Sequence, residues 1–289
     1  MIVDKSLSRG LADSVLQEFR QIRTGFMQRI GDACGGVPRR RAAVRAKAET
    51  LKCLGEELSL TQMIVNHHRW RWVTFNIFLP HILENDAGQD NRLVHYPLIR
   101  VHCANQKPVD VDGGTCTLLF VQEHAFERLF QRLNVMTAAQ VKEEVHDALC
   151  LSLLLCPAVF KLGLKQMVLP TRSGVFLCGV DEEKQGLIAK TWISYEKIQQ
   201  RLLDVNAAIR AVYDGEGGAP AMAERLGSVS IHDSPMHMDL PEDLLKSLRR
   251  FHWLQEPYSA RYDPEGEIWM HARRQAQGCA GQGQTPGAG

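Results

Sequence analysis

The most regular stretch of the sequence runs from Val121 to Asn134 and lies between a strand-like run and a second helical pattern. Side chains three and four positions apart share one side of a helix, so this stretch separates into two faces. The apolar face carries Phe126, Leu129, Phe130 and Leu133. The polar face carries His124, Glu127, Arg128, Gln131 and Arg132. The apolar face predicts a helix anchored on a core, which leaves the polar face as a candidate site for phosphate or RNA.

Composition limits the class of protein and gives this polar face no global electrostatic support. The chain of 289 residues is 45% hydrophobic and 23% charged, as in ordinary globular proteins, and its net charge is +1. Any anion site must therefore come from local clustering of cations. No apolar run approaches the roughly 20 residues that span a bilayer, and the N-terminus lacks a signal-peptide pattern. We expect a soluble, cytoplasmic protein with no membrane partner.

The eight cysteines stand singly, mostly among apolar residues, and no Cys-x-x-Cys pair occurs. This usage is typical of small buried hydrophobes in a reducing compartment, and it disfavours a disulfide framework or a zinc ribbon. Glycine-rich phosphate loops and serine-hydrolase or zinc-protease motifs are also missing from the sequence. We expect no cofactor and no bound metal.

Periodicity predicts an α+β protein with a central mixed or antiparallel sheet and a helix pair, flanked by helical regions. Residues 1–57 predict an N-terminal helical hairpin that is broken at Gly35–Pro38, and residues 58–195 predict the α+β core. Residues 196–272 predict a C-terminal helical and hairpin region, followed by a disordered tail over 273–289. Within the core, the patterns predict these elements: strands near 58–65, 67–78, 96–104, 115–121, 174–180 and 187–194; helices over 123–134 and 137–151; a loop over 83–95; and a turn-rich connection over 107–114.

A triple arginine, Arg39, Arg40 and Arg41, opens the second helix of the predicted hairpin. The positive end of the helix dipole disfavours cations at that place. The cluster therefore indicates an external anion or partner, unless it is a solvated helix face, which is common for short charge runs. We take these three arginines as candidate RNA contacts.

Alternation over residues 67–78 places Arg69 and Arg71 on one face of a predicted strand, and Trp70 and Trp72 on the other. Aromatic side chains stack bases and arginines meet phosphates, so this strand is a second candidate nucleic-acid surface. An amphipathic strand with its tryptophans in the core and its arginines in water explains the same pattern.

The pattern His-Ala-x-x-Arg-x-x-x-Arg occurs at His124, Ala125, Arg128 and Arg132, inside a strand–helix–helix–strands order. Over residues 115–195 the chain resembles the small ribonuclease toxin domains of the barnase/EndoU/RelE-like group. In those domains a helix-borne histidine and arginine face a late strand that contains a threonine. The resemblance implies a metal-independent endoribonuclease of toxin or antiviral-defence type, with the segment Lys190–Ser194 as the late strand.

The residue types suit this chemistry independently of the resemblance. Cleavage of RNA without a metal needs proton transfer, and histidine, here His124, is suited to that role because imidazole side chains exchange protons near neutral pH. It also needs cations for the phosphate, and the forked guanidiniums of Arg128 and Arg132 bind phosphate in pairs. Either Lys190 or Thr191 would complete the anion pocket, depending on the direction of the strand pleat.

Simpler explanations of these residues remain open at this point. His124 can cap its helix while both arginines pair with Glu123 and Glu127 at the surface. The dipeptide His146–Asp147 occurs in metal-dependent phosphohydrolases, but strands interrupt the helical bundle that such a site needs. His232 and His237 lie in a loop-like run whose spacing is not specific for a metal. The second candidate function is therefore a non-catalytic subunit of a bacterial assembly that binds nucleic acid or a protein, where the protein is a partner or an inhibitor.

Overall fold

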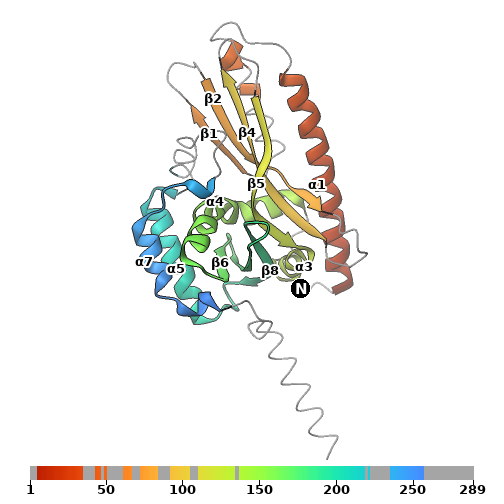
Figure 1. Ribbon diagram of the computed structural model, residues 1–289. Coiled ribbons are helices and arrows are strands. Elements are labelled where there is room, and N and C mark those ends of the chain that lie inside the picture. The colour runs from red at the N-terminus through yellow and green to blue at the C-terminus, as the bar shows by residue number, and fades with distance from the viewer. Residues whose placement is uncertain are drawn as a thin grey trace, which may run out of the picture.

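The computed structural model describes residues 5–34, 43–46, 49–50, 61–66, 72–83, 92–104, 110–133, 137–218, 221 and 235–256. Over these ranges the chain has an α+β fold, as predicted, in which helices surround one eight-stranded sheet. Figure 1 shows the long helix α1 (Lys5–Cys34) running along the sheet. In the same view helices α5 (Gln200–Gly215) and α7 (Glu242–Arg249) lie side by side on the side of the molecule away from α1.

The remaining elements follow in chain order. The strands are β1 Thr61–Asn66, β2 Trp72–Phe78, β3 His81–Leu83, β4 Leu93–Ala104, β5 Asp110–Gln122, β6 Gln166–Pro170, β7 Gly174–Asp181 and β8 Gly186–Ser194. The other helices are α3 Glu123–Leu133 and α4 Ala138–Leu162, and two 3-10 turns are η2 Pro235–His237 and η3 His252–Gln255.

The sheet consists of two antiparallel parts that meet at one parallel pairing. Strands β1, β2, β4 and β5 form the first part, and β3 pairs with the first three residues of β4. Strands β8, β7 and β6 form the second part. Residues Leu119–Val121 of β5 pair with Leu187–Ala189 of β8 in parallel. A parallel neighbour requires a crossover, which the chain makes through α3, α4, β6 and β7.

Helix α4 is the central helix of the core, and its start is fixed as the sequence predicts. Thr137 caps the helix by accepting a hydrogen bond from the backbone of Gln140, and the Gln140 side chain completes a capping box. The helix continues through Pro157 to Leu162, beyond the predicted end at 151, and terminates at Gly163 with a φ of 63°. Glycine tolerates this left-handed conformation without a Cβ clash.

By length and composition, the helical segment Ala139–Leu162 could cross a membrane. We had expected no such segment from the sequence. In the folded chain, 72% of its most apolar window is buried. Core helices of globular proteins share these properties, so the segment is accounted for by its packing inside the protein.

The N-terminal helix belongs to the same core as the sheet. Ala12, Val15, Leu16 and Phe19 of α1 are buried, and Phe19 meets Phe126 of α3 edge-to-face with ring centroids 6.3 Å apart. The same cluster includes buried leucines of α5 and α7. Residues from all three predicted segments of the chain thus share one hydrophobic core.

Several predicted boundaries are wrong, and the reasons are local. Strand β4 begins at Leu93, inside the predicted loop 83–95, and β5 begins at Asp110, inside the predicted connection 107–114. Long neighbouring strands extend each other through ladder hydrogen bonds, which composition alone does not reveal. Strand β6 was not predicted, because its run QMVLP is fully buried and shows no alternation.

Other predictions lie outside the described residues. These are most of the helix over 39–57, which is helical where it is described at 43–46 and 49–50, and the residues 67–71, 259–270 and 273–289. The candidate RNA contacts Arg39, Arg40, Arg41, Arg69 and Arg71 fall in this category.

Candidate active site

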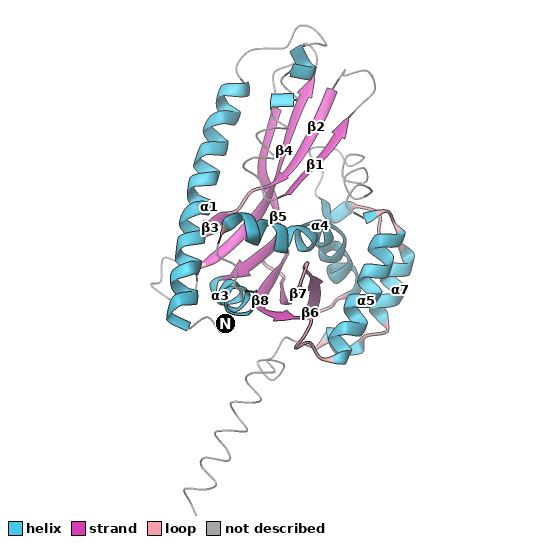
Figure 2. Cartoon of the chain, turned by 180° about the vertical axis from the view of Figure 1, so that it is seen from behind, coloured by secondary structure: helices cyan, strands magenta, loops and turns pink. Residues whose placement is uncertain are grey.

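Helix α3 takes the place of β5 beside strand β8. Strand β5 pairs with β8 only as far as Ala189, and the chain enters α3 at Glu123, so the helix follows the remaining half of β8. Figure 2 shows α3 next to β8. Arg132 Nη1 donates a hydrogen bond to the carbonyl oxygen of Trp192 at 2.5 Å, which satisfies a backbone acceptor of β8 from the side of the helix.

The two faces of α3 are arranged as the sequence predicts. Ala125, Phe126, Leu129 and Phe130 are fully buried, while His124, Arg128 and Arg132 are partly exposed. The first turn is fixed by Glu123, a buried carboxylate that accepts from the guanidinium of Arg92 at 2.6 Å. Arg92 also contacts Asp13 of α1. Glu123 is therefore engaged at the base of the helix and does not serve as the surface partner considered above.

His124 lies between an anion and a cation from its own helix. Its Nδ1 atom is 3.5 Å from Glu127 Oε2, and Arg128 Nε donates to its Nε2 atom at 3.3 Å. One neutral tautomer satisfies both contacts, with the proton on Nδ1 and the lone pair on Nε2. The side chain is 43% exposed, so the ring is oriented by the protein and is also accessible to solvent.

The polar row continues from Arg128 to the N-terminal helix. Arg128 Nη1 donates to Gln131 Oε1 at 3.2 Å, and Gln131 Nε2 donates to Ser8 Oγ of α1 at 3.0 Å. The amide of Gln131 is thereby oriented by two partners. Sequence reasoning placed Gln131 on the polar face but did not recognise this link, since it depends on α1 packing against α3.

The two predicted residues of β8 differ in environment. Thr191 is 6% exposed and pairs with Leu177 of β7. Lys190 is partly buried, and a register shift in the β7–β8 ladder leaves it without a directly opposite residue. Its side chain lies over Gly179, where an added Cβ would come within 2.9 Å of Lys190 Cε. The simple alternation that we used for this strand is thus interrupted at Lys190, because a bulge changes which side each following residue faces.

The structure therefore brings α3 and β8 together, and it joins them directly through Arg132. It places His124, Glu127 and Arg128 in contact with one another. Thr191 is packed inside the sheet, so its side chain is much less accessible than that of His124.

A buried polar network, which the sequence analysis did not predict, links α4 to the side chain of Trp192 in β8. Glu144 of α4 is 4% exposed and accepts from the hydroxyl of Thr171 at 2.6 Å and from the backbone of Ser173 at 2.7 Å. Trp192 Nε1 donates to the same hydroxyl at 3.1 Å. The available signal was the helical position of Glu144, three residues after Val141 and four before Ala148, which places it on the apolar face of α4, where a carboxylate needs fixed partners.

The other candidate metal-binding or catalytic residues have structural surroundings. Asp147 forms an ion pair with Arg210 at 2.7 Å, and His146 lies 3.9 Å from the thiol of Cys150. Within the described ranges no group of three His, Cys, Asp or Glu side chains could hold a metal ion. His232 lies outside the described residues, and His237 is an exposed residue at the end of η2.

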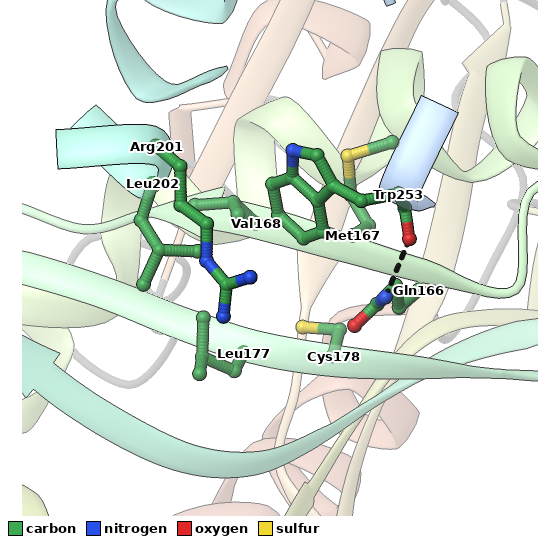
Figure 3. A pocket seen from close by; sticks show the side chains of 8 residues that line it. All are labelled: Gln166, Met167, Val168, Leu177, Cys178, Arg201, Leu202 and Trp253. Atoms are coloured by element: carbon green, nitrogen blue, oxygen red, sulfur yellow. Dashed lines mark hydrogen bonds between the residues drawn. The ribbon is translucent and has the colours of Figure 1, made fainter. Parts of the chain in front are cut away.

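A small cavity lies between β6, β7, α5 and η3, away from α3 (Figure 3). Gln166 donates to the carbonyl of Trp253 at 2.7 Å, and the Arg201 guanidinium lies 5.4 Å from the centre of the Trp253 ring. Burial raises the pKa of the Cys178 thiol in its wall, which disfavours the reactive thiolate. Cys178, Cys103, Cys150 and Cys156 are all buried free thiols.

Comparison with protein-family models, with curated proteins and with solved structures finds no significant match to this chain.

Proposed function

We propose that the protein is a metal-independent endoribonuclease of toxin or antiviral-defence type that acts on RNA in the cytoplasm. The observation that carries this proposal is the placement of His124, which is partly exposed and lies between Glu127 and Arg128. An oriented and partly exposed imidazole beside a guanidinium supplies the two functions that cleavage of a phosphodiester needs, proton transfer and a cation for the phosphate.

In the proposed reaction the ribose 2′-oxygen attacks the adjacent phosphorus and the bond from phosphorus to the 5′-oxygen breaks. His124 Nε2 removes the proton from the 2′-hydroxyl or, once protonated, returns a proton to the 5′-oxygen that leaves. Glu127 stabilises the imidazolium that forms, because a carboxylate near Nδ1 favours the charged ring. Arg128 moves from His124 Nε2 to the phosphate, where its fork stabilises the developing negative charge.

The remaining predicted residues take different roles in this proposal. Arg132 is a positioning residue, because one of its donors is used to hold α3 against the backbone of Trp192. Lys190 would supply a further cation on the β8 side only by turning away from Gly179 of β7, over which its side chain lies. Thr191 is left out of the substrate-contacting set, since its side chain is 6% exposed.

The second candidate is a non-catalytic subunit that binds RNA or a protein partner. The specific observation that favours it is the engagement of the polar face with the rest of the fold. Arg132 reaches Trp192, and Arg128 continues through Gln131 to Ser8. A face that mainly joins α1, α3 and β8 needs no catalytic role.

RNA cleavage in the presence of EDTA separates the two candidates. We expect the wild-type protein to cut a mixed RNA substrate under these conditions and His124→Gln to lose at least a hundredfold in rate, in line with removal of a general acid or base. His252→Gln is the matched control, because His252 is an exposed histidine on η3, outside the site. Both variants should keep the wild-type melting temperature.

Intact RNA with both wild type and His124→Gln, together with equal RNA binding by the two, would support the binding subunit and end the enzyme proposal. Cleavage that persists in His124→Gln would also end it.

A further inference from the structure

A second cluster of histidines lies where α1, β3 and β4 meet. His81 of β3 and His95 of β4 are directly opposite in the antiparallel ladder, and His81 Nδ1 lies 2.5 Å from His95 Nε2. His95 Nδ1 lies 3.0 Å from Thr117 Oγ1, and the His95 ring stacks on Phe120 with an interplanar angle of 11°. The pair is thus held in place by two strands of the sheet.

The guanidinium of Arg23 from α1 acts on both histidines. Burial is the largest cause of the lowered pKa of His81, followed by the charge of Arg23; for His95 burial is followed by the charge of His81 and then by that of Arg23. Arg23 Nη1 is buried and has no hydrogen-bond partner among the described residues. A buried donor without an acceptor loses its hydration and gains no hydrogen bond in return, so the folded chain has an unmet requirement for an acceptor at this point.

Three features of the cluster indicate the chemistry of the missing acceptor. Its named charged or chargeable members, Arg23, His81 and His95, can all become cationic and none can become anionic. Each side chain is only partly buried, so the edge of the cluster meets solvent. Guanidinium and imidazolium groups bind phosphate oxygens through charge-assisted hydrogen bonds.

We propose that Arg23, His81 and His95 form an anion site that takes a phosphate group. One oxygen of the phosphate would accept from the Arg23 guanidinium after a small movement of that side chain, and another would accept from His81. The bound anion would satisfy the buried donor of Arg23 and fasten α1 to the β3–β4 edge. The phosphate would come from inorganic phosphate or from the terminal group of a nucleotide.

This site is separate from the proposed ribonuclease site and does not depend on it. The start of α3 is joined to the chain just before β4, because the backbone N–H of Glu123, the neighbour of His124, donates to the carbonyl of Arg92. His95 lies three residues after Arg92, which is roughly 10 Å at about 3.3 Å per residue of strand. The further site would therefore anchor a phosphate at a distance from the bond that is cut.

Isothermal titration of the full chain with inorganic phosphate, at ionic strength held constant with chloride, tests the proposal. We expect saturable binding to the wild type and at least a tenfold loss of affinity in Arg23→Gln. Arg20→Gln is the matched control, because it removes the same charge from an exposed position of the same helix and should bind as the wild type does.

Parallel titration with a nucleoside 5′-monophosphate separates the two sources. Equal affinities indicate a site for free phosphate, and tenfold tighter binding of the nucleotide indicates a terminal phosphate on a larger ligand. Absence of saturable binding for both probes, or unchanged binding in Arg23→Gln, overturns the proposal. If Arg23→Gln does not fold, Arg23→Lys serves in its place. Its affinity for phosphate should be lower than that of the wild type.

Discussion

Acidification should destabilise the protein through His95 before the carboxylates titrate. Burial, followed by the charges of His81 and Arg23, lowers the pKa of His95 from 6.5 to about 4. The unfolded chain therefore binds a proton on this ring between pH 6.5 and 4 that the folded chain does not bind. Stability is fully present above the unfolded pKa and is lost as the pH falls through this window.

The magnitude follows from the two pKa values. Between pH 7 and pH 5, the full shift makes unfolding easier by about 2 kcal/mol. The ring is partly exposed to water, which screens its interactions, so we expect about 1 kcal/mol from His95. The pKa of His81 is also lowered, and its contribution has the same sign.

Urea unfolding at pH 7, 6 and 5 measures this effect as a change in the free energy of unfolding at constant slope. The variant His95→Gln should lose most of the dependence on pH in this range, whereas His252→Gln, at an exposed position, should keep it. An equal loss of stability on acidification in the wild type and in His95→Gln would refute the reasoning. Phosphate should be left out of these buffers, because a bound anion would favour the protonated rings.

Two further predictions concern helix α4. Thr137→Ala removes the N-cap and should lower the free energy of unfolding by about 1 kcal/mol, measured by urea denaturation; an effect below about 0.3 kcal/mol would argue against the capping geometry. Glu144→Ala leaves the hydroxyl of Thr171 and the backbone of Ser173 without their buried acceptor, and should lower the free energy of unfolding by about 2–4 kcal/mol. The control Glu143→Ala changes an exposed side chain and should lower it by less than about 1 kcal/mol. Equal melting temperatures for the two variants would show that the contacts of Glu144 do not stabilise the fold.

The parts of the fold that the sequence predicted are those specified by local chemistry. The faces of α3 follow from the spacing of Phe126, Leu129 and Phe130, and the start of α4 follows from Thr137 and Gln140. In both cases the residues that decide the structure lie within one or two helical turns of each other.

The parts that were missed depend on contacts between distant segments. Pro157 favours a helix end by its missing N–H, yet the surrounding core keeps α4 helical to Leu162. The bulge at Lys190 arises from the register of β7 against β8, which no pattern within β8 contains.

The candidate site was predictable in part for the same reason. His124 and Arg128 are adjacent through helical spacing alone, so their contact could be anticipated. The contact of Arg132 with the Trp192 carbonyl, and the link through Gln131 to Ser8, required the relative placement of α1, α3 and β8. The pairing of His81 with His95 required knowledge of the β3–β4 register.

The contact between Arg132 and Trp192 also bears on how copies of this chain meet one another. A strand that loses its neighbour halfway exposes backbone acceptors and donors, and such an edge recruits strands from other molecules. Beyond Ala189, β8 would present such an edge, but α3 lies along it and Arg132 occupies one of its carbonyls. Helix α3 thereby also covers the middle of the sheet against pairing with other molecules, so loss of Arg132 should lower the solubility of the protein.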